Sequence, residues 1–234
     1  MPSARQIEIE QPSGEQTRTD LHSMLQDIRA SNISNLNSLH RRGKVLFSEG
    51  EPARGIYILR TGRASVSITS SEGKVVILRM AEAGDVLGLN SVLRGCSYDA
   101  TVKTLDPCRT DFIARSEVID LLETQAGAKA MLALLSGELS ELNNRTRSLL
   151  LPQTASGRLA KLLLDWSQQN GSNTSSGEPI DKAFTHEEIA QMICSSRETV
   201  TRLLASMSRR QIIQVNSGNI LIRDREALEA VAVS

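Results

Sequence analysis

Aromatic side chains and net charge are both scarce in this 234-residue chain, and each shortage excludes a kind of binding site. Aromatic residues make up 3% of the sequence, which argues against a surface built from stacked aromatic platforms. The 27 basic and 27 acidic side chains cancel, so any attraction to nucleic acid must be local rather than general. The remaining composition, 40% hydrophobic and 23% charged, is ordinary for a globular protein long enough for two modest domains.

Cysteines and long apolar runs are also scarce. The three cysteines, Cys96, Cys108 and Cys194, match no zinc or iron–sulfur spacing, and their sparse, odd number indicates a reducing compartment. No apolar run approaches the roughly 18 residues of a membrane span. Residues 1–20 lack the apolar core of a secretory signal. We therefore expect a cytoplasmic protein with no membrane partner, and the sequence implies no metal or other cofactor.

The first part of the chain is polar. Residues 1–18 are predicted to form a disordered arm, because they contain too little apolar surface to form a core. After a cap at Asp20, helical spacing predicts one short helix. Its apolar positions are Leu21, Met24, Leu25 and Ile28.

Short strand-like runs punctuated by glycines fill the region from about residue 40 to residue 115. The runs are VLF, IYIL, ASVSI, VVILRM, VLGL and ATV. The segment SSEGK at 70–74 is typical of a hairpin turn. Many short strands with glycine turns at this spacing predict a small β-barrel or β-sandwich.

Helical periodicity begins at Arg115 and includes a long apolar seam. Its members are separated by steps of three and four residues over nearly three heptads. They are Leu132, Leu135, Leu139, Leu142, Thr146 and Leu149. Two interpretations are open: the helix packs on its own β-domain, or the seam pairs two chains in a dimer.

The C-terminal region predicts two short helices joined by a tight turn. Pro152 ends the long helix, and residues 169–179 form a polar loop. Thr185 and Glu188 make the capping box of a helix with the sequence HEEIAQMI. The segment CSS is the turn, and Ser196 caps the next helix, RETVTRLLASMSRR. This arrangement is a candidate helix-turn-helix.

The second of these helices has one apolar face and one polar face. Val200, Leu203, Leu204 and Met207 are predicted to face inward. Arg197, Glu198, Thr201 and Arg202 are left on the outer side. Because an arginine fork matches guanine O6 and N7, and a glutamate accepts from cytosine N4, this face can read base edges in a major groove. The alternative is a solvated helix that merely packs in a small helical domain.

Residues 212–222 follow as a predicted β-hairpin with its turn at NSGN, which would form a wing beside the helix. Between residues 182 and 223, six basic side chains stand against three acidic ones. This surplus is modest, but it is local, as groove binding requires.

With these parts in this order, the chain resembles the Crp/Fnr superfamily of bacterial transcription regulators, relatives of the cyclic-AMP receptor protein. The resemblance covers about residues 20–232, and THEEIAQMICSSRETVTRLL at 185–204 is close to the family signature. It implies an α+β fold with an N-terminal jelly-roll-like β-roll, a long dimerisation helix and a C-terminal winged helix-turn-helix. The implied boundaries are 1–18 for the arm, 19–127 for the β-roll, 128–151 for the helix and 152–234 for the DNA-binding domain.

The same resemblance implies roles for particular residues. Arg197, Glu198 and Arg202 would read bases of TGTGA-like half-sites in double-stranded DNA. Thr185, Ser196 and Thr199 match positions that touch phosphates. The dimer seam would consist of Leu132, Leu135, Leu139, Leu142 and Leu149. A two-fold homodimer would bind a palindrome with half-sites one helical turn apart.

The effector cassette departs from the family pattern. In members that bind cyclic nucleotides, a Gly-Glu pair holds the ribose and an Arg-Ser pair holds the cyclic phosphate. In the matching stretch, residues 84–102, Gly88 is present but Leu89 replaces the glutamate, and Tyr98 and Asp99 replace the arginine and serine. The phosphate would lose its paired charge and meet a carboxylate instead. We therefore predict that cyclic AMP is not bound in the family's usual way.

The sequence does not identify an effector. Arg94 lies near the altered cassette and is a candidate to replace part of the missing charge. Asn143 and Asn144 fall on the predicted dimer helix. Three interpretations of this pair are open: it contacts a ligand, it sets the register of the two helices, or it is exposed to solvent. The candidate effector pocket therefore comprises Leu89, Tyr98, Asp99, Arg94, Asn143 and Asn144.

Other sensor chemistries of the family have little support. The oxygen sensors use an N-terminal cysteine cluster, whereas no cysteine precedes Cys96 here. His22 and His40 lie in polar surroundings and are expected to be surface residues, not haem ligands. Cys194, at the predicted turn, is expected to be a small buried residue. A thiol switch at Cys96 or Cys194 is the alternative.

The leading hypothesis is a homodimeric, sequence-specific DNA-binding transcription regulator with a degenerate effector domain. RNA polymerase is a further candidate partner. The second hypothesis is a small-molecule sensor whose β-roll is the functional part and whose winged helix contacts proteins. Catalysis is not expected, because the sequence shows no nucleophile–base set and no phosphate-binding glycine loop.

Overall fold

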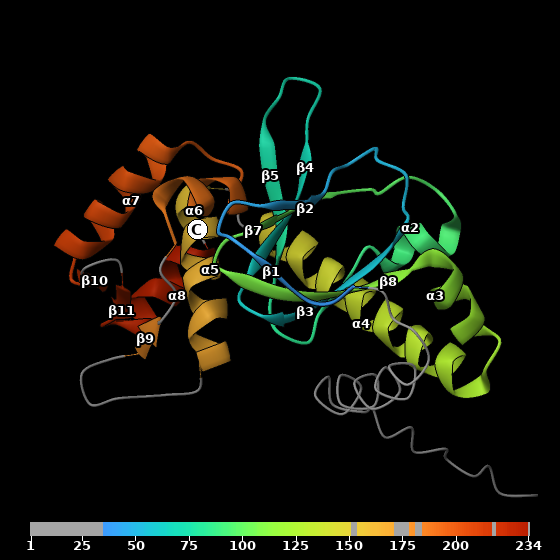
Figure 1. The fold of residues 1–234 in the computed structure, drawn as a ribbon. Helices are drawn as coiled ribbons and strands as arrows, with labels where there is room; N and C mark the ends of the chain where they lie inside the picture. Colours follow the sequence, from blue (N-terminus) through green and yellow to red (C-terminus); the bar gives the residue numbers. More distant parts are fainter. Residues whose placement is uncertain (1–34, 151–153, 171–177, 181–183, 217–218, 234) are drawn as a thin grey trace, which may run out of the picture. The chain divides into compact units, whose positions relative to one another are not determined.

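The computed structural model describes residues 35–150, 154–170, 178–180, 184–216 and 219–233 (Figure 1). The chain divides into two compact units. One contains the residues up to 64 together with 81–140, and the other contains 65–80 together with the residues from 141 onward. The predicted arm at 1–18 and the short helix after Asp20 lie outside the described residues.

Two four-stranded sheets form the predicted β-roll (Figure 1). The first has the strand order β1-β8-β3-β6. Its strands are β1 (Asn35–His40), β3 (Gly55–Thr61), β6 (Val86–Leu87) and β8 (Cys108–Ala114). The second has the strand order β2-β7-β4-β5. Its strands are β2 (Val45–Phe47), β4 (Ala64–Thr69), β5 (Val75–Ala81) and β7 (Thr101–Thr104).

The first sheet has an apolar interior and one buried ion pair. Leu59 of β3 and Ile113 of β8 are 0% and 1% exposed, and burying such a side chain contributes about 1.5–3 kcal/mol. Asp111 of β8 lies 2.5 Å from the Arg60 guanidinium of β3 and accepts a 2.6 Å hydrogen bond from the Asn37 backbone N–H of β1. Asp111 therefore connects three neighbouring strands, which compensates for its burial.

Most of the predicted strands are confirmed, and so is the hairpin turn at 70–74, where Ser70 N–H donates to the Lys74 carbonyl at 2.9 Å. The prediction of VLGL as one strand is wrong at its end. Gly88 adopts a left-handed φ of 84°, and helix α2 (Leu89–Arg94) begins immediately after it. Strand β1 was not predicted, because NLNSLH has little apolar alternation.

Two helices follow the roll, α3 (Arg115–Leu122) and α4 (Gln125–Leu150). The long helix of the sequence analysis therefore exists and begins at Gln125. Of its predicted seam, Leu132, Leu139 and Leu142 are exposed and Leu135 is half-buried. The side chain of Leu149 lies outside the described residues.

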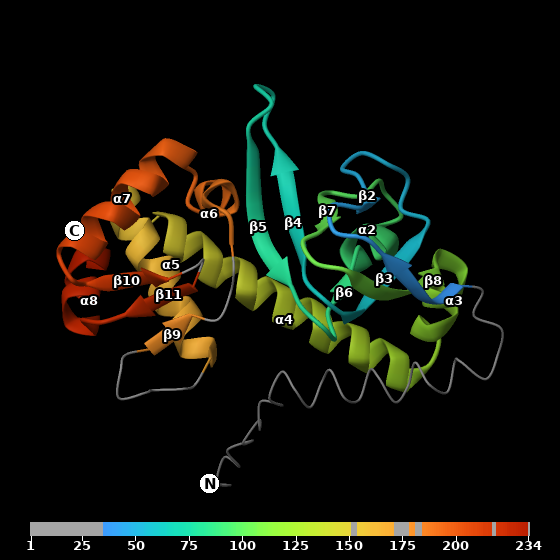
Figure 2. The ribbon, with the colours of Figure 1, turned by 60° about the vertical axis from the view of Figure 1, so that its left-hand side comes forward.

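The C-terminal part is a helix-turn-helix with a three-stranded sheet (Figure 2). Its helices are α5 (Ala155–Asn170), α6 (His186–Met192), α7 (Arg197–Arg209) and α8 (Arg225–Val233). Its strands are β9 (Glu178–Ile180), β10 (Ile213–Asn216) and β11 (Asn219–Ile222), in the order β10-β11-β9. Buried side chains of α5, α6, α7 and the sheet form one core that includes Leu163, Ile189 and Leu204.

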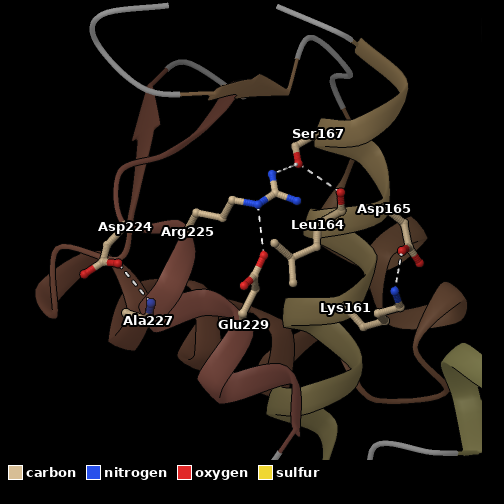
Figure 3. Close-up of polar contacts among 8 residues, drawn as sticks. All are labelled: Lys161, Leu164, Asp165, Ser167, Asp224, Arg225, Ala227 and Glu229. Carbon is tan, nitrogen blue, oxygen red and sulfur yellow. Dashed lines mark hydrogen bonds and ion pairs between the residues drawn. The ribbon is translucent and has the colours of Figure 1, made fainter. Parts of the chain in front are cut away.

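The final helix, α8, packs along α5 (Figure 3). Asp224 begins α8 by accepting a 2.9 Å hydrogen bond from the Ala227 N–H. Arg225 then donates to Glu229 at 2.9 Å and to the Ser167 hydroxyl of α5 at 3.4 Å. Neither α8 nor β9 was predicted. The short segment EPI was assigned partly to the polar loop at 169–179.

Some features of the described residues limit the kinds of site present. No helix in them is long and apolar enough to cross a membrane. They also contain no group of three or more metal-ligating side chains. The thiols of Cys96, Cys108 and Cys194 are all free.

Candidate nucleic-acid interface

Helix α6 begins with the capping box predicted from the sequence. The Thr185 side chain accepts a 3.2 Å hydrogen bond from the Glu188 N–H, and the Glu188 carboxylate accepts a 2.7 Å bond from the Thr185 N–H. Both bonds satisfy backbone donors that a helix start would otherwise leave free. The box therefore fixes the residue at which the first helix of the motif begins.

The turn between α6 and α7 is tight and is held from α5. Cys194 adopts a left-handed φ of 52°, and the Ser195 N–H donates to the Ala190 carbonyl at 2.9 Å. The Arg158 guanidinium of α5 donates to the Ile193 carbonyl at 2.8 Å. A left-handed residue does not continue a right-handed helix, so α6 ends before Cys194 and α7 begins at Arg197.

Helix α7 divides into the two faces that the sequence predicted. Val200, Leu204 and Met207 are buried in the core of the unit, and Leu203 is partly buried against it. The polar side chains Arg197, Glu198, Thr201 and Arg202 are all exposed. Glu198 and Arg202 lie four residues apart, so they occupy neighbouring positions on one face within the first two turns.

The charges on this face suit hydrogen bonds to bases. The pKa of the Glu198 carboxyl is lowered, chiefly by a hydrogen bond from its own backbone N–H, then by one from the Ser196 side chain and by the nearby Arg197 charge. A lowered pKa means that the carboxylate stays ionised at neutral pH and loses its charge only in acid. It is therefore an acceptor for an amino group such as cytosine N4, between two permanent cations.

The residues expected to touch phosphates lie at the starts of the two helices. Ser196 caps α7 by accepting a 3.2 Å hydrogen bond from the Thr199 N–H, and its hydroxyl lies 3.1 Å from that of Thr199. Thr185 occupies the equivalent position at α6. The N–H groups and the dipole of a helix start favour an anion there, so the location is suitable for a phosphate.

One contact on this face was missed by the sequence analysis. His186, the first residue of α6, places its Nδ1 atom 2.8 Å from the Thr201 hydroxyl of α7. The same hydroxyl donates to the Arg197 carbonyl at 3.0 Å. The two residues are fifteen positions apart, so no spacing pattern within a single helix could have indicated the pair.

The predicted wing is present, and basic side chains lie next to it in the sequence. Strands β10 and β11 pair antiparallel from Ile213 opposite Ile222 to Asn216 opposite Asn219, and the turn residues 217–218 lie outside the described residues. Arg223, just after β11, donates to the Gln214 side chain of β10. Arg209 and Arg210 are exposed at the end of α7.

Two side chains of the altered cassette, Leu89 and Tyr98, are buried in the β-roll. Leu89 is 1% exposed, so the position assigned to a ribose-binding glutamate is part of the apolar core. Tyr98 is buried and donates a 2.5 Å hydrogen bond from its hydroxyl to the Gly55 carbonyl. Its ring stacks on Phe47 with the centroids 3.8 Å apart. A side chain on Gly88 would collide with this ring, because a Cβ atom there would lie 2.7 Å from Tyr98 Cε1.

Tyr98 belongs to an aromatic cluster that also contains Phe47, Tyr57 and Phe112, with centroid separations of 5.8 Å for Phe47–Tyr57 and 4.9 Å for Tyr57–Phe112. Burial is the largest of the effects that raise the pKa of Tyr98. The phenol therefore stays neutral and keeps the proton that it donates. These four aromatic residues therefore serve as packing in the roll.

The other candidate pocket residues lie at the surface. Asp99 is exposed and accepts a 2.8 Å hydrogen bond from the Asn90 side chain. Arg94 and Asn143 are also exposed, and the side chain of Asn144 lies outside the described residues. The structure therefore separates a buried pair, Leu89 and Tyr98, from exposed polar residues.

The thiols and His40 have ordinary structural surroundings. Cys194 is half-buried, so the prediction of a small buried residue at the turn is wrong in degree. Cys96 is also half-buried, and its thiol lies 3.7 Å from the Ser91 carbonyl. His40 lies 2.8 Å from the Thr110 hydroxyl, and burial and the Lys44 charge lower its pKa. His22 lies outside the described residues.

Comparison with known proteins gives a match in each half of the chain. Residues 39–125 match the model of the cyclic nucleotide-binding domain, and residues 157–231 match that of the Crp-like helix-turn-helix domain. A CRP-like cAMP-activated global transcriptional regulator of Mycobacterium tuberculosis is 28% identical, with 80% of this chain and 84% of the relative covered. The anaerobic regulatory protein of Bacillus subtilis is 26% identical, with 78% of each covered. In fold, FixK2 of Bradyrhizobium japonicum matches 86% of this chain and 98% of its own, with a TM-score of 0.72 at 22% identity.

Proposed function

The chain belongs to the Crp/Fnr superfamily of transcription regulators, and from that premise we propose that it binds a palindromic DNA operator as a homodimer. It is a DNA-binding regulator rather than an enzyme, as its relatives are. The observation that carries the proposal is the exposed face of α7. There Arg197, Glu198 and Arg202 project from a helix whose other side is anchored in the core.

The chemistry of this face favours half-sites that contain guanine and cytosine contacts at fixed positions. An arginine donates two parallel hydrogen bonds to guanine O6 and N7, and an ionised glutamate accepts from cytosine N4. TGTGA-like half-sites, with a complementary TCACA strand, offer these partners. Thr185, Ser196 and Thr199 would contact phosphates and thereby set the depth of α7 in the groove.

The dimer proposal rests on α4. Leu132, Leu139 and Leu142 are 69%, 60% and 50% exposed in the single chain, and they fall on one seam of a 26-residue helix. A row of exposed leucines at steps of seven and three residues is the pattern of a two-stranded coiled coil. The occupant that we propose for this seam is α4 of a second copy.

We propose further that cyclic AMP does not control this DNA binding. The buried Leu89 and Tyr98 offer no charge to a cyclic phosphate, and the Tyr98 ring occupies space next to Gly88. Arg94 and Asp99 are exposed on the surface of the same region and carry opposite charges. A regulator with this cassette would bind DNA without the nucleotide.

Such a regulator would act on chromosomal DNA in the cytoplasm, with RNA polymerase as the partner through which it changes transcription. Whether it activates or represses depends on where its operators lie.

Two experiments test this function. Selection from random double-stranded DNA should enrich a palindrome whose half-sites resemble TGTGA and are separated by one helical turn. Sedimentation of the free protein should give the mass of two 25.5 kDa chains. If selection yields no consensus and the winged helix binds proteins instead, the second hypothesis replaces this one. That hypothesis is a small-molecule sensor whose winged helix contacts proteins.

A further inference from the structure

The hydroxyl of Thr201 makes two polar contacts within the helix-turn-helix. It donates to the Arg197 carbonyl at 3.0 Å and lies 2.8 Å from the His186 Nδ1 atom. A hydroxyl has one hydrogen, so when that hydrogen is used on the carbonyl the imidazole must supply the other proton. With the hydroxyl hydrogen on the carbonyl, the His186 tautomer that carries its hydrogen on Nδ1 is the one that donates in this contact.

This contact fixes the rotamer of Thr201. Threonine in a helix divides between two χ1 rotamers because its hydroxyl can bond to the carbonyl of the preceding turn in one of them. His186 selects that rotamer by adding a second bond to the same hydroxyl. The hydroxyl is drawn back toward the helix, and the methyl group remains as the unbonded part of an exposed side chain.

The methyl group of Thr201 belongs to the same exposed part of α7 as the residues proposed to read bases. Thr201 lies one turn after Arg197, directly before Arg202, and all three are exposed. An apolar group at such a position has one distinctive partner in a major groove, the C5-methyl group of thymine.

We propose that Thr201, held by His186, is a specificity-determining residue that recognises one thymine in each half-site through its methyl group. His186 is then a positioning residue, which acts on the DNA through Thr201. This inference rests on the proposed function, because it requires α7 to lie in a major groove.

Replacing thymine by deoxyuridine tests the inference directly, because the two bases differ only in the C5-methyl group. Each thymine of the selected operator is replaced in turn, and binding is measured by fluorescence anisotropy at fixed salt. At one thymine position, the same in both half-sites, the replacement should weaken binding of the wild-type protein about fourfold. This is the effect expected from losing one apolar contact of the size of a methylene group. The other thymines should show smaller effects.

Matched variants separate the methyl group from the hydroxyl. Thr201→Ser keeps the hydroxyl and loses the methyl group, so its preference for thymine over deoxyuridine at that position should disappear. Thr201→Val keeps a methyl group but loses the hydroxyl that His186 contacts, so it should retain only part of the preference, as His186→Ala does. His186→Ala should weaken it, whereas His186→Asn should largely restore it, because the asparagine amide can donate in place of Nδ1.

The outcomes separate this inference from the proposed function. If the wild-type protein selects no operator, the proposed function fails and the inference fails with it. If it selects an operator but no thymine shows the preference, or if Thr201→Ser keeps the preference unchanged, only the inference is overturned. A loss of binding to all sequences in His186→Ala, without rescue in His186→Asn, would assign His186 a structural role and contradict its positioning role.

Discussion

The α7 face and the effector cassette differ in how their side chains are used. On α7, Arg197, Glu198 and Arg202 are exposed within the first two turns of the helix. In the cassette, Leu89 and Tyr98 are buried, and the only polar atom of the Tyr98 side chain already donates to Gly55. One region can still form hydrogen bonds with a ligand, and the other has used its bonds for its own packing.

The difference shows that the two regions of one regulator need not change together. The charged face of α7 is held by the opposite, apolar face of the same helix, which is buried in the core. A ligand pocket can instead be replaced by core, because a buried aromatic ring and a leucine contribute stability without a ligand. Three experiments test whether the two regions are as independent as this comparison holds.

The largest expected effect is on the stability of the roll. Tyr98→Ala removes a stacked, buried ring and should lower the free energy of unfolding of the roll by about 3–5 kcal/mol. Tyr98→Phe keeps the ring and loses only the bond to Gly55, so it should cost about 1–2 kcal/mol. Urea denaturation followed by circular dichroism measures both. Equal, small losses in the two variants would show that the ring does not act as core.

The fluorescence of Trp166 provides an internal control for this experiment. It is the single tryptophan of the chain and stacks on Phe184 in the C-terminal unit, with the centroids 4.5 Å apart. Its unfolding transition should be much less affected by Tyr98→Ala than that of the roll. A parallel shift of both transitions would show that the two regions unfold together.

The next effect concerns base recognition. Arg197→Ala should weaken binding to the selected operator by about 1–3 kcal/mol and relax the preference at one base pair of each half-site. Arg210→Ala, at an exposed residue beyond the other end of α7, is the matched control and should lower affinity evenly across sequences. Competition binding with single-base variants of the operator distinguishes the two patterns. An even loss in Arg197→Ala would remove that residue from base reading.

The smallest effect concerns the cap of α7. Ser196→Ala loses the bond from the Thr199 N–H and should destabilise the C-terminal unit by about 1 kcal/mol. Ser196→Asp restores an acceptor and should recover this stability, while its added negative charge should weaken binding to DNA. Thermal unfolding and operator binding, measured on the same samples, separate the two contributions. If Ser196→Asp recovers both the thermal stability and the operator affinity of the wild-type protein, no phosphate lies near this cap.

Local patterns predicted the helix-turn-helix well. The capping box at Thr185, the cap at Ser196 and the buried face of α7 all depend on neighbours within four residues, and each was correct. Their interactions are short in sequence, so one window of the chain contains both partners.

Interactions between distant residues could not be predicted in this way. The His186–Thr201 contact and the bond from Arg158 to Ile193 join different helices. Strand β9 is only three residues long and depends on pairing with β11. In the cassette, the sequence showed which residues were replaced, but it did not show that Tyr98 would turn inward onto Phe47.

The central claim is that the α7 face binds DNA while the cassette no longer responds to cyclic AMP. The most direct test is a titration of the purified protein against a TGTGA-type palindrome, with and without cyclic AMP, at fixed salt. We predict tight binding that depends on the sequence and has the same Kd in both conditions. Binding that appears only when cyclic AMP is present would contradict the claim and would mean that Leu89 and Tyr98 do not close the pocket.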